Sequence, residues 1–171
     1  MWLSERRGLT NRRGFLAGLG VLALTAGCGF RPVYGPQGQG RALRGAIRLE
    51  DPVTRNDFQF VTAFEDILGR PTATRYALSY SITTEEIGGG AVQNLGDTRI
   101  QVFGTLEFSV TALDSGAEVA SGDIRNNTTY STTSTQLATL TAKEDAELRL
   151  MRLLAEALAT RLYTEPGLSP T

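Results

Sequence analysis

Two long stretches of alternating apolar and polar residues constrain the fold of this chain more than any other feature. Residues 73–87 and residues 100–111 each place apolar side chains at about every second position. The apolar members are Tyr76, Leu78, Tyr80 and Ile82 in the first stretch and Ile100, Val102, Leu106, Phe108 and Val110 in the second. A period of two predicts β-strands with one buried face and one polar face. The polar face is either solvated or covered by something outside the chain.

A first helix is predicted before these strands. Thr54 or Asn56 can cap a helix that continues to Leu68, because the apolar side chains between them fall at helical spacing and form one face. Gly69 follows at the position where a helix commonly ends. This pattern predicts a helix with one face packed on a sheet.

The last segment of the chain has the clearest helical pattern. Thr141 and Glu144 have the spacing of a capping box, in which each residue satisfies a backbone N–H at the start of a helix. Apolar residues between positions 150 and 162 then form a broad stripe. Charged residues interrupt the stripe too often for a membrane span, so it is interpreted as a core-facing surface.

The remaining segments predict two further strands and their connections. Residues 44–50 form a short strand candidate, and residues 118–132 a polar strand typical of a sheet edge. Glycines 88–90 together with residues 94–97 predict a long flexible connection, whereas residues 114–116 predict a tight turn. The order βαβββα predicts an α+β two-layer sandwich, with a mainly antiparallel four-stranded sheet and two helices on one face.

The composition argues against an enzyme. Histidine is absent, Lys143 is the sole lysine and Cys28 the sole cysteine, so the usual general base, zinc ligands and thiol nucleophiles are missing. We therefore expect no metal. Glu85 and Glu86 could in principle form a carboxylate pair, but neighbours on a strand point to opposite faces. The first 27 residues hold four of the 17 basic side chains and one of the 18 acidic ones, so the remainder is acidic and does not suggest nucleic acid.

Residues 1–27 have the order of a cleaved export signal. Four arginines, including Arg12 and Arg13, precede an apolar stretch over residues 15–26 that ends in small residues. That stretch of about a dozen residues is shorter than the ~20 that a membrane-spanning helix needs. Asn11, Arg12 and Arg13 also resemble a twin-arginine export motif, although any basic signal can hold two adjacent arginines. The sequence therefore does not decide between the Sec and the twin-arginine export routes.

The end of this signal resembles the lipobox of bacterial lipoproteins. Leu24, Thr25, Ala26 and Gly27 would be recognised by the lipoprotein signal peptidase, and Cys28 would become the first mature residue. Its thiol would carry diacylglycerol and its amine a third acyl chain, which together anchor a protein stably. Thr25 stands where an aliphatic residue is more usual. The other interpretation is an ordinary signal and a buried thiol. We expect no other cofactor.

These boundaries predict the domain organisation. Residues 28–43 would be the lipidated cysteine and a flexible tether, because the segment is rich in Gly, Pro and Gln. Residues 44–165 would form a single α+β domain, and residues 166–171 a disordered tail.

Several segments resemble the LptE family of lipopolysaccharide-assembly lipoproteins. The match lies in Cys-Gly-Phe-Arg-Pro-Val-Tyr-Gly at 28–35, in Tyr-Ser-Thr at 130–132, in Ala-Lys-Glu-Asp-Ala-Glu at 142–147 and in the helical pattern of 153–162. The resemblance implies a lipoprotein held on the periplasmic side of the outer membrane by its lipidated cysteine. It would plug the β-barrel protein LptD, help to assemble it, and assist delivery of lipopolysaccharide to the outer leaflet.

The resemblance also implies basic contacts to lipopolysaccharide, for which Arg75, Arg99 and Arg125 are the candidates. A guanidinium on a strand can bind phosphate bidentately, although exposed arginines also simply keep a surface soluble. A different function for the same architecture is a lipid-anchored periplasmic binding module or chaperone that uses the sheet as a platform.

Overall fold

The computed structural model describes residue 35 and the ranges 38–92, 96–132 and 135–168. The chain divides into two compact units, residues 1–32 and residues 33–171, and every described residue belongs to the second. The fold described below is therefore that of the second unit alone.

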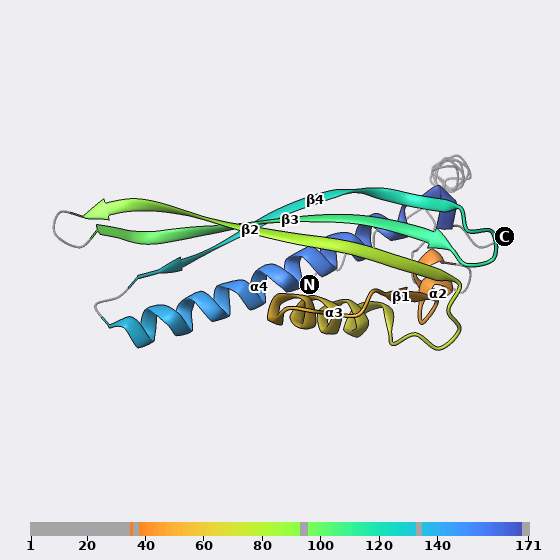
Figure 1. The fold of residues 1–171 in the computed structure, drawn as a ribbon, viewed down its shortest axis with the longest axis horizontal. Coiled ribbons are helices and arrows are strands. Elements are labelled where there is room, and N and C mark those ends of the chain that lie inside the picture. The colour runs from red at the N-terminus through yellow and green to blue at the C-terminus, as the bar shows by residue number, and fades with distance from the viewer. Residues whose placement is uncertain (1–34, 36–37, 93–95, 133–134, 169–171) are drawn as a thin grey trace, which may run out of the picture. The chain divides into compact units, whose positions relative to one another are not determined.

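Four strands form one mainly antiparallel sheet in the order β1-β2-β3-β4 (Figure 1). β1 (Ile47–Leu49) pairs in parallel with the start of β2 (Tyr76–Val92). β3 (Gly96–Ala112) and β4 (Glu118–Ser131) follow as antiparallel neighbours. β4 is thus an edge strand, as its polar sequence predicts.

The helices α3 (Arg55–Leu68) and α4 (Gln136–Tyr163) lie on one face of this sheet (Figure 1). The predicted α+β class with its two-layer arrangement is confirmed. The structure adds two short elements, the helix α2 (Gln39–Leu43) and the 3₁₀ turn η2 (Pro166–Leu168), so the predicted count of two helices was too low.

Helix α3 has the bounds that its sequence predicts. Thr54 is the N-cap residue, and its hydroxyl accepts a hydrogen bond from the Asp57 backbone N–H at 3.2 Å. In return the Asp57 carboxylate accepts one from the Thr54 N–H at 2.8 Å, which completes a capping box. Gly69 ends the helix with a φ of 79°, a backbone conformation that favours glycine.

Helix α4 begins five residues earlier than the predicted capping box. Its first residue is Gln136, so Thr141 lies inside the helix and its hydroxyl donates to the Leu137 carbonyl at 3.0 Å. A Ser or Thr inside a helix can bond the carbonyl four residues back in this way. The spacing of Thr141 and Glu144 therefore does not mark the start of α4, and the predicted capping box is wrong. The 28 residues of α4 extend about 42 Å at 1.5 Å per residue.

The core lies between the helices and the strand side chains that alternate toward them. Leu106 and Val110 of β3 are fully buried, as are Leu150 and Leu154 of α4. At Gly104 the two layers approach closely, because a Cβ there would lie 3.0–3.1 Å from side-chain atoms of both α4 leucines. The absent side chain of Gly104 thus sets how near α4 can pack on β3.

Three predicted boundaries need correction. β2 continues through glycines 88–90 to Val92, because β3 pairs with it in constant register and overrides their weak strand propensity. The predicted tether ends earlier, since residues 39–43 form α2 and Leu43 is fully buried. The predicted disordered tail begins later, because residues 166–168 form η2 and Leu168 is 1% exposed.

Candidate functional site

The face of the sheet opposite the helices is polar and is covered by no described helix or strand (Figure 1). We call it the open face. Its side chains come from alternate positions of the three long strands: Ser79, Ser81, Thr83, Glu85 and Ile87 of β2, Gln101, Phe103, Thr105, Glu107, Ser109 and Thr111 of β3, and Ser121, Asp123, Arg125, Asn127, Thr129 and Ser131 of β4. Hydroxyl, amide and carboxylate groups dominate this surface. Such a surface suits a wet or polar partner rather than a lipid.

The carboxylate of Glu118 organises one end of the open face. It accepts hydrogen bonds from the hydroxyls of Ser121 at 2.7 Å and Ser109 at 2.8 Å, which lie on neighbouring strands. These two bonds, first that from Ser121, lower the pKa of Glu118 below its ordinary value. Nearby, the Arg125 guanidinium lies 3.4 Å from Asp123. The polar groups at this end therefore satisfy one another in part.

The structure does not bring the three predicted lipopolysaccharide contacts together. Arg99 and Arg125 share the open face, but Arg99 pairs with Ser131, six residues and about 20 Å along β4 from Arg125. Arg75 precedes β2, where its guanidinium donates to the Ala42 carbonyl at 2.7 Å and lies 5.5 Å from the centre of the Tyr76 ring. Three separated cations do not form a phosphate site, and their role stays a prediction.

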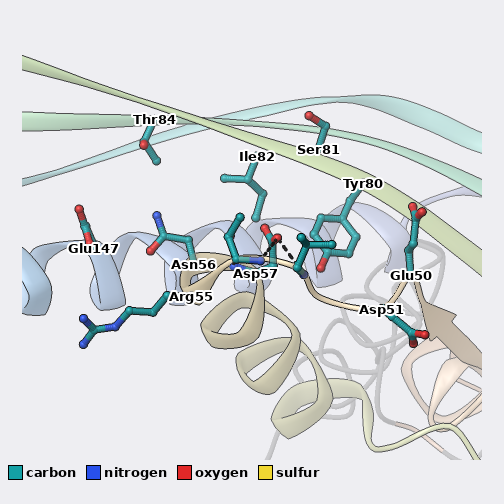
Figure 2. Close-up of a pocket in the computed structure, with 12 residues that line it drawn as sticks. Glu50, Asp51, Arg55, Asn56, Asp57, Tyr80, Ser81, Ile82, Thr84 and Glu147 are labelled. Atoms are coloured by element: carbon teal, nitrogen blue, oxygen red, sulfur yellow. Dashed lines mark hydrogen bonds between the residues drawn. The ribbon is translucent and has the colours of Figure 1, made fainter.

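A groove of about 650 Å³ lies where β1 leaves the sheet (Figure 2). We call it the edge groove. Its residues come from β2, from the segment after β1, from the start of α3 and from α4: Glu50, Asp51, Val53, Thr54, Arg55, Asn56, Asp57, Tyr80, Ser81, Ile82, Thr84 and Glu147. Figure 2 shows Tyr80, Ile82 and Thr84 pointing from β2 toward the helices, with Asn56 and Asp57 facing them from α3.

The edge groove carries excess negative charge. Four of its side chains are carboxylates, and the guanidinium of its single arginine, Arg55, is bound at 2.8 Å to Glu144, which is not a lining residue. Burial raises the pKa of Tyr80 to about 12, and the charges of Asp57, Glu50 and Asp51 add to the effect. Tyr80 therefore stays a neutral phenol at physiological pH.

The sole lysine lies in a polar cluster that joins β2, β4 and α4. Lys143 lies 2.8 Å from a Glu86 carboxylate oxygen, whose partner oxygen accepts a hydrogen bond from the Tyr130 hydroxyl at 3.3 Å. The bond to Glu86 raises the pKa of Lys143, and burial raises that of Tyr130. Glu85 lies on the open face, so the two adjacent glutamates do point to opposite faces, as expected.

Sequence reasoning missed this cluster and the edge groove. The cluster needs three elements to meet, and nothing in the spacing of Glu86, Tyr130 and Lys143 indicates contact. The groove depends on β1 having only three residues and pairing with one end of a far longer strand.

The export and lipidation residues lie outside the described part of the chain. This holds for Arg12 and Arg13 and for the lipobox, residues 24–28. Within the described residues there is no group of His, Cys, Asp or Glu side chains arranged to hold a metal ion. The described helices include none whose length and hydropathy would let it cross a membrane.

Comparison with known proteins relates this fold to bacterial lipoproteins. A lipoprotein structure from Caulobacter crescentus CB15 matches with a TM-score of 0.61 at 17% identity, over 73% of this chain and 93% of that one. Rare lipoprotein B from Shewanella oneidensis matches with a TM-score of 0.51 at 13% identity, over 68% and 91%. Lipoprotein B from Nitrosomonas europaea matches with 0.51 at 12%, over 72% and 84%. No family model and no curated sequence matches. At these identities the likeness shows a shared fold.

Proposed function

We propose that this chain is a lipid-anchored lipoprotein of the Gram-negative outer membrane that plugs the LptD β-barrel, helps to assemble it, and assists delivery of lipopolysaccharide. Two independent lines support the proposal. The sequence resembles the LptE family at 28–35 and at several later segments, and solved structures that share the fold are named as lipoproteins. The proposed mechanism is assembly and gating, without bond chemistry.

The open face is the observation that carries the proposal. β2 and β3 have 17 residues each, about 56 Å at 3.3 Å per residue, and yet only one side of them is covered by the described helices. A large polar surface on rigid strands fits the water-filled interior of a barrel, whose inward side chains are also polar.

Lipidation at Cys28 would hold this surface at the membrane. Each buried methylene contributes about 0.8 kcal/mol, so two or more acyl chains make the anchor stable. Replacing Cys28 with Ala should abolish incorporation of labelled palmitate into the full chain. A Cys28→Ala protein that still incorporates palmitate would refute the lipobox interpretation.

The partner can be tested by co-purification from detergent-solubilised outer membranes. The tagged full chain should bring down a large β-barrel protein in equal amount, and depletion of the chain should leave lipopolysaccharide in the inner membrane. Co-purification of a different protein in equal amount, with no barrel protein present, would instead favour an anchored binding module or chaperone.

A pair of variants links this result to the open face. Thr105→Trp places a bulky side chain at the middle of that face and should reduce barrel recovery at least tenfold. Glu156→Trp, at an exposed position of α4, is the matched control and should recover the barrel normally. Equal recovery by both variants would mean that the open face is not the contact surface.

A further inference from the structure

Among the described residues, no strand pairs with the outer edge of β2 over most of its length. β1 pairs with only Tyr76, Ala77 and Leu78, and the last bond of this ladder runs from the Glu50 N–H to the Leu78 carbonyl at 2.9 Å. Beyond Leu78, no described strand pairs with this side of β2. The edge groove begins at the point where β1 departs (Figure 2).

The direction of the backbone groups along this edge follows from the ladders. The Tyr76 N–H and the Leu78 carbonyl both bond toward β1, so even-numbered residues of β2 direct their backbone groups to that side. The register with β3 is constant, so Tyr80, Ile82 and Thr84 do the same. The edge groove therefore has a floor of backbone donors and acceptors, about 16 Å long for the five residues 80–84.

This edge lacks several of the devices that normally protect a strand from pairing with another chain. Natural edges carry charged side chains (especially lysine), proline, bulges or a covering element. The charged residues of β2 are Glu85 and Glu86, which lie beyond the groove. Residues 79–92 contain no proline and no lysine, and the register of β2 with β3 shows no shift among the described pairs. The opposite edge of the sheet, formed by β4, differs. There the Arg149 side chain of α4 donates to the Thr129 carbonyl at 3.1 Å and occupies a backbone group that could otherwise pair with another strand.

Charge selects among the segments that could pair with this edge. The carboxylates of Glu50, Asp51 and Glu147 line the edge groove. The nearby cations neutralise these groups only in part. Arg55, which also lines the groove, is bound to Glu144 at 2.8 Å. Arg48 lies 3.9 Å from Asp51, and Lys143 lies 4.0 Å from Glu147 but 2.8 Å from Glu86. A segment with basic side chains at alternate positions would complement these groups, while an acidic segment would be repelled.

We propose that the edge groove binds an extended, basic segment of a partner protein, which adds a strand beside Tyr80, Ile82 and Thr84 of β2. Main-chain hydrogen bonds would give affinity, and alternate side chains facing the carboxylates would give specificity. The proposal concerns the sheet edge and does not rest on the proposed function, which concerns the open face.

Photo-crosslinking of the full chain in its native cells tests this. A benzoylphenylalanine at Asn56, which lines the groove, should crosslink to a segment of another protein with basic residues at alternate positions. The same probe at Thr83, on the open face, should not reach that segment. Thr84→Pro deletes a backbone N–H that points to the free edge and takes no part in the β2–β3 ladder, so it should lower the Asn56 crosslink at least fivefold. Thr84→Val keeps the N–H and should retain it.

A charge variant gives a second measurement should Thr84→Pro unfold the protein, which a thermal melt will show. Glu50→Gln combined with Glu147→Gln leaves the strand edge intact and should lower the crosslink at least threefold. The proposal is overturned by a crosslink that survives both changes, by one to an acidic segment or to a second copy of this chain, or by the absence of any crosslinked protein at Asn56.

Discussion

The two faces of the sheet are built from the same strands, and yet one is buried under the helices and the other is not. Along β3, Leu106, Phe108 and Val110 face the helices and are buried, whereas Thr105, Glu107 and Ser109 alternate with them on the open face. An antiparallel sheet needs only one buried face for stability. The comparison teaches that core positions and the surface positions to which we assign partner binding alternate along one strand, so substitutions one residue apart should separate stability from the proposed binding.

The largest difference between the faces should come from truncation at their centre. Leu106 is fully buried, so Leu106→Ala should lower the free energy of unfolding by about 2–5 kcal/mol through lost burial and a cavity. Thr105→Ala, one residue away on the open face, should lower it by about 1 kcal/mol or less, since it loses strand propensity but leaves no core cavity. Urea denaturation followed by circular dichroism measures both. Similar losses would mean that the open face contributes to the core.

Replacing a strand glycine with alanine should also have different effects on the two faces of the sheet. A Cβ at Gly104 would lie 3.0–3.2 Å from atoms of Leu150 and Leu154, so Gly104→Ala should destabilise the protein by about 1–3 kcal/mol. At Gly89 the nearest atom would be the Arg99 carbonyl oxygen at 4.0 Å, and Gly89→Ala should be neutral or stabilise by up to about 1 kcal/mol. Thermal melts of both variants make the comparison. A tolerated alanine at 104 would contradict the close packing of α4.

The helix layer that covers one face depends in part on its caps. Thr54→Ala removes the acceptor for the Asp57 N–H and should cost about 1 kcal/mol. Thr54→Ser keeps a hydroxyl and should recover most of this loss. Chemical denaturation of the two variants tests the capping box, and an equal loss in both would assign the effect to the methyl group of Thr54 instead.

The open face should make a small contribution that depends on pH. Hydrogen bonds from Ser121 and Ser109 lower the pKa of folded Glu118 below its ordinary value. A depressed carboxyl pKa stabilises the fold above the unfolded pKa, and this stabilisation is lost as the pH falls through the folded pKa. Replacing both serines with Ala should therefore lower the free energy of unfolding at pH 7 and change it little at low pH, where Glu118 is protonated. The opposite trend, measured by urea titration at both pH values, would exclude this network.

The parts of the fold that were predicted from sequence are those set by local chemistry. Thr54, one of the two predicted capping residues, begins α3, and the period of two marks the buried face of β2 and β3. Glycines 88–90 were misassigned because strand pairing with β3 determines their conformation. Helix α2 was missed because five residues are too few for a periodic pattern, and the burial of Leu43 is a tertiary effect.

The candidate site was predictable only as a polar face. Alternation along the strands indicates that such a face exists, but the positions of Arg75, Arg99 and Arg125 along the sheet depend on strand register. The edge groove was beyond sequence reasoning, because the length of β1 determines where the edge of β2 becomes free.

Helix α2 has a mechanical consequence for the folded body. The Gln39 side-chain amide donates to the carbonyls of Glu165 at 2.9 Å and Leu162 at 3.3 Å, beside the end of α4. A pull on the chain at Gln39 would therefore load the end of α4 as well as α2, before it reaches the short parallel pairing of β1 with β2. Under such a load the two bonds of Gln39 would resist first, and extraction of the buried Leu43 would follow.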